Sequence, residues 1–105
     1  MRVTRGILMT SPIPEPLRSV LESRFNVEVQ GRGWIEFIRN YAATTEDGGR
    51  LFRRQFAHAL LHQSISPDDY YAATQDPNYP TAEELYERLR EVWAWLYDNA
   101  PVTED

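Results

Sequence analysis

Apolar side chains recur along this chain at the spacing of α-helices, and the pattern is clearest near its end. In residues 82–98, four side chains fall within a stripe of about 60° on a helical wheel: Leu85, Leu89, Val92 and Leu96. Thr81, followed three residues later by Glu84, has the pattern of a capping box. Pro101 cannot continue a helix. We therefore expect a helix that begins after Thr81 and ends near Asp98.

Three earlier segments carry comparable helix signals. Residues 15–25 place four apolar side chains on one stripe: Leu17, Val20, Leu21 and Phe25. Pro16 suits the first turn of this helix. Residues 50–63 predict a helix whose inner stripe consists of Phe52, Phe56, Ala59, Leu60 and Gln63. Leu51 and Ala57 flank this stripe. Ser66, Pro67 and Asp69 combine an N-cap, a proline at the first helical position and a capping-box acid, which predicts a short helix to about Thr74.

The segment "NVEVQGRGWIEFI", residues 26–38, allows two interpretations. Val27 and Val29 alternate with polar residues, so Gly31–Gly33 could turn a short β-hairpin. Alternatively the glycines connect two helices, and Trp34, Ile38 and Tyr41 form one face of the second. We favour the helix, because an isolated hairpin is only marginally stable.

These elements predict an all-α fold, a small bundle of four to five helices with short connections. Residues 1–10 are treated as a tail of uncertain order, and residues 11–105 as a single helical domain. Either Met1 or Met9 could be the natural start, since "MTSPIPEPLRSV" runs directly into the first helix signal.

Composition agrees with a globular domain and excludes some chemistry. Hydrophobic residues make up 42% of the chain, and it contains no Cys, so disulfides and thiolate zinc sites are excluded. Neither a membrane span of ~20 apolar residues nor a signal-peptide core is visible. We expect a cytoplasmic protein without membrane contact.

Charge is distributed unevenly along the chain. Residues 1–66 carry a net charge of +3, whereas residues 67–105 carry −8, which together give the formal −5. An acidic third repels nucleic acid and attracts basic partners. It could equally be a solvated surface that keeps the protein soluble.

Trp93 and Trp95 lie two residues apart on the final helix, so their indoles diverge by about 200°. Trp93 falls beside the apolar stripe and is expected to be buried. Trp95 falls among charged residues: Glu84, Glu87, Arg88, Glu91 and Asp98. Either another segment covers Trp95, or it is an exposed anchor for a partner, because Trp is enriched at interface hot spots.

Candidate catalytic and metal-binding chemistry is sparse. His58 and His62 have the i, i+4 spacing of two zinc ligands, but Ala59 replaces the catalytic Glu of the metalloprotease motif and no third ligand is indicated. Arg50, Arg53 and Arg54 form too narrow a basic cluster for nucleic-acid binding. We predict no catalytic residue, no metal site, no cofactor, no nucleic-acid partner and no enzymatic activity.

Residues 52–97 resemble the C-terminal part of small bacterial immunity proteins of contact-dependent growth inhibition and other polymorphic toxin systems. The resembling features are a helix ending in "SIS", then "PDDYYAAT", then "PTAEELYERLREVW". "WIEFIRNY" is similar to an early helix of the colicin-immunity type. The resemblance implies a cytoplasmic antidote that binds a cognate toxin, often a basic nuclease, and blocks its active site.

Together, the acidic segment and the resemblance lead to the hypothesis of a toxin-neutralising protein with an acidic helical binding face. The predicted partner-binding residues are Trp95, Glu84, Glu87, Glu91 and Asp98, with Asp68 and Asp69 as a second acidic cluster. The alternative is a small structural or regulatory domain that acts by homo-oligomerisation. The sequence does not identify the toxin or the oligomeric state.

Overall fold

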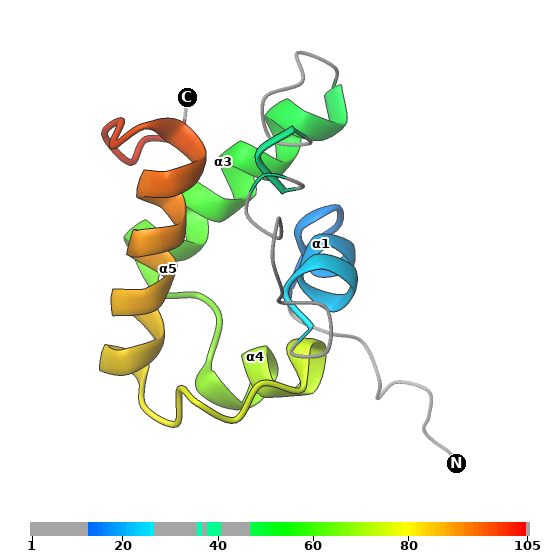
Figure 1. Cartoon of the computed structure of the whole chain (residues 1–105), viewed down its shortest axis with the longest axis vertical. Coiled ribbons are helices and arrows are strands. Elements are labelled where there is room, and N and C mark those ends of the chain that lie inside the picture. The colour runs from blue at the N-terminus through cyan, green and yellow to red at the C-terminus, as the bar shows by residue number, and fades with distance from the viewer. Residues whose placement is uncertain (1–12, 27–35, 37, 41–46, 105) are drawn as a thin grey trace.

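The computed structural model describes residues 13–26, 36, 38–40 and 47–104, and every regular element within them is an α-helix. The labelled helices are α1 (Leu17–Arg24), α3 (Asp47–His62), α4 (Pro67–Thr74) and α5 (Ala82–Tyr97) (Figure 1). Helix α3 packs against both α1 and α5, and α1 also packs against α4. This confirms the predicted all-α bundle. The tail expected at residues 1–10 lies outside the described residues.

The segment with two interpretations is described only in part. Glu36 and residues 38–40 are helical, and Ile38 is fully buried in the core. This agrees with the favoured helix at these positions. Residues 27–35, which the alternative hairpin would need, lie outside the described residues. None of the described helices has the length and apolar character needed to cross a bilayer.

Helix α5 provides one wall of the core, as its apolar stripe predicts. All four residues of that stripe are buried: Leu85, Leu89, Val92 and Leu96. They pack with the buried side chains of α1 and α3, which include Leu21 and Phe52, and with Phe25 at the end of α1. A single apolar cluster therefore joins the first and last helices of the described chain.

Helix α3 differs from its prediction at both ends. It begins at Asp47, so Gly48 and Gly49 belong to its first turn, where Gly49 is buried. At the other end the helix stops at His62, and Gln63 takes a positive φ of 48° that removes its side chain from the inner stripe. Gln63 is exposed, so its predicted place in the core is wrong.

The rest of the α3 stripe is confirmed, with one flanking residue corrected. Phe52, Phe56, Ala57, Ala59 and Leu60 are buried. Leu51 is exposed instead, because it lies about 140° around the helix from Phe56. The inner face of α3 is therefore narrower on the Leu51 side than the sequence suggested.

The predicted helix starts of α4 and α5 are confirmed at the level of single hydrogen bonds. The Ser66 hydroxyl accepts from the Asp69 N–H at 3.1 Å, with Pro67 at the first helical position. The Thr81 hydroxyl likewise accepts from the Glu84 N–H at 3.2 Å. Side-chain oxygens thus satisfy amide donors that the helices cannot pair internally.

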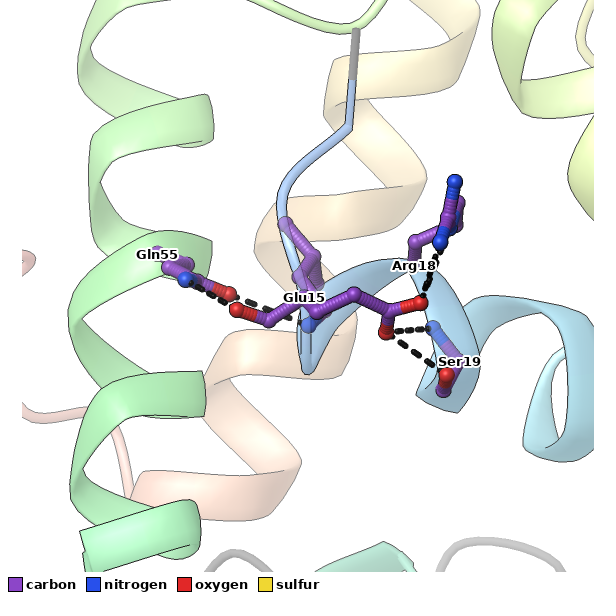
Figure 2. Close-up of polar contacts among 5 residues, drawn as sticks. Glu15, Arg18, Ser19 and Gln55 are labelled. Atoms are coloured by element: carbon purple, nitrogen blue, oxygen red, sulfur yellow. Dashed lines mark hydrogen bonds and ion pairs between the residues drawn. The ribbon is translucent and has the colours of Figure 1, made fainter. Parts of the chain in front are cut away.

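The beginning of α1 is held by a side chain from α3 (Figure 2). The Gln55 side chain accepts from the Leu17 N–H at 3.0 Å and donates to the Glu15 carbonyl at 2.6 Å. The Glu15 carboxylate accepts from the Ser19 hydroxyl at 2.6 Å and from Arg18 at 2.6 Å. These contacts, with Ser19 the stronger influence, lower the pKa of Glu15.

Candidate partner-binding site

The two tryptophans of α5 have opposite environments. Trp93 is only 2% exposed, packs edge-on against Phe56 and donates from its indole N–H to the Ala100 carbonyl at 2.8 Å. Trp95 is 42% exposed. The expectation that Trp93 is the buried one is confirmed, and the exposed fraction of Trp95 favours an exposed anchor over a ring covered by another segment. An indole therefore stands on the outer face of a strongly acidic helix.

One cation of the same helix lies directly over the exposed indole. The guanidinium carbon of Arg88 is 5.1 Å from the centre of the Trp95 ring, within cation–π range. Arg88 also forms an ion pair with Glu91, with 3.5 Å between Nη1 and Oε1. Trp95, Arg88 and Glu91 therefore form a compact cluster on successive turns of α5.

Arg88 connects this cluster to the loop that precedes α5. Burial raises the pKa of the Tyr79 phenol, and the positive charge of Arg88 opposes that rise. Arg88 acts in the same way on Tyr70, whose pKa burial raises further. The charge of Arg88 thus acts on a phenol of α4, Tyr70, and on one of the loop before α5, Tyr79, and the raised pKa values keep both phenols protonated at neutral pH.

The other predicted acids of α5 have different local roles. Glu84 lies in the first turn, where its carboxylate accepts from the Thr81 hydroxyl at 2.9 Å. It is separated from Trp95 by about 16 Å along the helix axis. Glu87 is exposed between these two positions. Asp98 ends the helix with a φ of 52° and forms an ion pair with Arg39. The four acids therefore line the length of α5 and do not converge on one point.

Asp68 and Asp69 lie in the first turn of α4 and are separate from the indole cluster. The Asp69 N–H is used in the Ser66 cap. Asp68 is exposed and borders a hollow of about 260 Å³. The other lining residues are Pro67, Tyr71, Asp76, Pro77, Tyr79 and Pro80. This small cavity, with aromatic, proline and acidic walls, was not visible in the sequence.

Asp76 is the buried acid that sequence reasoning missed. It is only 3% exposed, and one carboxylate oxygen accepts from the Asn78 N–H at 3.1 Å and from the Asn78 amide at 2.7 Å. Its own N–H donates to the Thr74 hydroxyl at 3.1 Å. The Asp-Pro-Asn composition correctly predicted a loop. Burial of this carboxylate depends on the way the loop folds against α4, which composition does not encode.

A second group of titratable side chains assembles where the chain after α5 returns to α3. The Glu104 carboxylate contacts His58 Nδ1 at 2.7 Å and His62 Nε2 at 3.3 Å. These hydrogen bonds, that to His58 first, lower the pKa of Glu104. The spacing of His58 and His62 was visible in the sequence, which indicated no third ligand. The structure supplies one, because Glu104 lies 42 residues from His62 and only the fold brings it there.

One arginine of the α3 cluster, Arg53, is directed at aromatic rings of α5. The guanidinium carbon of Arg53 lies 5.1 Å from the Trp93 ring centre and 5.4 Å from that of Tyr97. The Arg53 Nη1 group also donates to the Thr103 carbonyl at 3.5 Å. Arg53 therefore contacts the aromatic edge of α5 and the segment that follows it.

No family model, curated protein or solved structure matched this chain. The resemblance to immunity proteins therefore stays a prediction, as do the absence of enzymatic activity and the identity of any partner. The exposed ring of Trp95 is the feature from which a function can be argued.

Proposed function

We propose that this protein is an immunity protein that binds and neutralises a cognate bacterial toxin domain through the outer face of α5. The observation that carries the proposal is the 42% exposure of Trp95 on an acidic helix. A buried indole would have left α5 with charged groups alone, which contribute little as isolated contacts at the rim of an interface.

The carboxylates near Trp95 favour a partner with a positively charged surface. Glu91 lies about one turn and Glu87 a little over two turns before the indole, and Glu84 extends the acidic surface toward the beginning of α5. Carboxylates arranged in this way accelerate encounter with a positively charged surface, while a desolvated aromatic ring slows dissociation. Arg88 supports the indole from one side and leaves the rest of the ring for the partner.

Neutralisation then follows from occupation of the toxin's active-site groove. A nuclease binds its substrate through a basic groove that contacts phosphates. An acidic helix seated there repels the nucleic acid and also blocks its access sterically. This mechanism requires no catalytic residue in the inhibitor.

The test uses a candidate toxin domain, to be sought in the reading frames beside that of this protein. Calorimetry would compare the wild-type protein with Trp95→Ala, and a co-expression assay would measure rescue of growth. We expect Trp95→Ala to raise Kd by at least about 30-fold, the scale of a hot-spot residue, while the midpoint of urea unfolding changes little. Unchanged affinity, or a large loss of stability, would contradict the proposal.

Leu61→Ala provides the matched control. Leu61 is also a large apolar side chain, 52% exposed, but it lies on α3. Its removal should leave both affinity and stability near the wild-type values. An equal loss of affinity in Leu61→Ala would show that the binding surface lies elsewhere.

The homo-oligomer alternative is less well supported. Within the part of the chain that the structure describes, the large exposed apolar residues are spread over three helices: Leu51 and Leu61 on α3, Tyr71 on α4 and Trp95 on α5. A stable symmetric interface usually needs a contiguous apolar patch. Sedimentation of the free protein should give the monomer mass of 12.3 kDa, and a dimer mass would favour the alternative.

A further inference from the structure

The cluster of His58, His62 and Glu104 has the composition of a transition-metal site. Helical spacing places the two imidazoles on one face of α3, with 4.4 Å between their ring centres. The three potential ligand atoms all lie within 4.8 Å of one another, and all three side chains are exposed. An ion can therefore reach them directly from solvent.

The contact distances are compatible with a shared ion. Zinc bonds to nitrogen and oxygen of about 2.0–2.2 Å, at tetrahedral angles, separate neighbouring ligand atoms by about 3.3 Å. Here a Glu104 oxygen lies 2.7 Å from His58 Nδ1, and the other lies 3.3 Å from His62 Nε2. Small rotations of exposed side chains would replace the two hydrogen bonds by bonds to one metal ion.

The surroundings also suit an ion that keeps an open position. Two imidazoles and one carboxylate are ligands that Zn²⁺ accepts, and three protein ligands leave a fourth site for water or another group. A hollow of about 180 Å³ borders His58 and Glu104, so there is room beside the cluster.

We propose that His58, His62 and Glu104 bind a Zn²⁺ ion that fastens the segment after α5 to the surface of α3. This segment already contacts the helices at two other points, the Ala100 and Thr103 carbonyls. The metal adds a third connection, made of coordinate bonds. The site lies on α3 and the C-terminal segment, and it is independent of the toxin-binding proposal for α5.

Titration of the untagged protein with Zn²⁺ alone, at fixed neutral pH, tests the site. We expect one ion per chain in the wild type. His62→Gln and Glu104→Gln should each weaken binding by at least about 100-fold, since even residues that only orient a ligand typically cost 10–100-fold. Glu22→Gln, which removes an exposed acid from α1, should bind zinc as the wild type does.

Hydrogen exchange separates a zinc clamp from a simple histidine pair. Zinc should slow exchange of the backbone amides in residues 99–104 of the wild type, but not of Glu104→Gln. If Glu104→Gln binds zinc as tightly as the wild type, the third ligand and the clamp are wrong. If the wild type binds zinc no more tightly than His62→Gln, the cluster is a hydrogen-bonded contact only, and the proposal is overturned.

Discussion

At the scale of single residues, one hydroxyl group buried in the core holds the connection between α3 and α4. The Tyr86 hydroxyl of α5 donates to the Ile65 carbonyl at 2.8 Å and accepts from the Ile65 N–H at 2.9 Å. Ile65 lies between α3 and α4, where no helix can pair its backbone groups. One side chain therefore satisfies both, and burial raises the pKa of the Tyr86 phenol.

Removing this hydroxyl should be costly. Tyr86→Phe keeps the ring but leaves the buried N–H and C=O of Ile65 without their partner. We expect the free energy of unfolding to fall by about 1–3 kcal/mol, the usual penalty for an unsatisfied buried polar group. Urea denaturation measures this loss. Tyr71→Phe, at an exposed ring on α4, is the control and should change stability little.

The sequence could not have predicted the contact between Tyr86 and Ile65. Helical periodicity reports the direction of a side chain, and that information was sufficient to distinguish Trp93 from Trp95. It does not report which backbone groups of a distant connection arrive beside a hydroxyl. The same limit applies to Glu104, whose meeting with His58 depends on the path of the chain after α5.

At the scale of elements, the helices differ in how far their first turns can be predicted from neighbouring residues. The caps of α4 and α5 are local, because Ser66 and Thr81 bond to amides three residues later, and the sequence predicted both. The start of α1 combines a local carboxylate, Glu15, with the distant Gln55. Of the residues at the start of α1, only Pro16 was predicted from the sequence.

The Glu15 contacts should make α1 sensitive to acid. The folded-state pKa of Glu15 is lowered from the ordinary 4.5, so the contribution of its carboxylate is fully present above pH 4.5 and is lost as pH falls through the folded-state value. Thermal unfolding from pH 7 to pH 2 should show wild type more stable than Glu15→Gln at neutral pH, with the difference vanishing in acid.

Glu22→Gln is the control for this measurement, since Glu22 is an exposed acid on the same helix. A stability difference between wild type and Glu15→Gln that persists unchanged at pH 2 would contradict the assigned role of the Glu15 carboxylate. Glu104 also has a lowered pKa, so some acid sensitivity should remain in Glu15→Gln.

At the scale of the whole molecule, the charge asymmetry follows the fold. The acidic third of the chain, residues 67–105, forms α4, α5 and the segments around them. The helical class, the four helices and most of the core were predictable, because amphipathic periodicity and caps are local properties. The candidate site was predictable only along α5. The hollow beside Asp68 and the His58 cluster bring together residues distant in sequence, which no local pattern encodes.

This asymmetry predicts how binding to a basic toxin domain should respond to salt. Long-range attraction raises the association rate and is screened by ions, whereas the contact of Trp95 is not. Between about 50 and 500 mM salt, we expect the association rate constant to fall about tenfold or more, with a smaller change in the dissociation rate.

Stopped-flow measurements provide both rates. Glu87→Gln should lower association at low salt and have little effect at high salt, while Trp95→Ala should act mainly on dissociation. A rate of association that does not depend on salt would show that the acidic surface has no part in steering the partner.

The bond between Gln55 and the start of α1 has a consequence for the order in which the chain becomes structured. Leu17 and Gln55 are 38 residues apart, and the Gln55 side chain that pairs with the Leu17 N–H is present only after more than half of the chain has been synthesised. An eight-residue helix is too short to persist alone in water. Helix α1 therefore depends on its contact with α3 to persist.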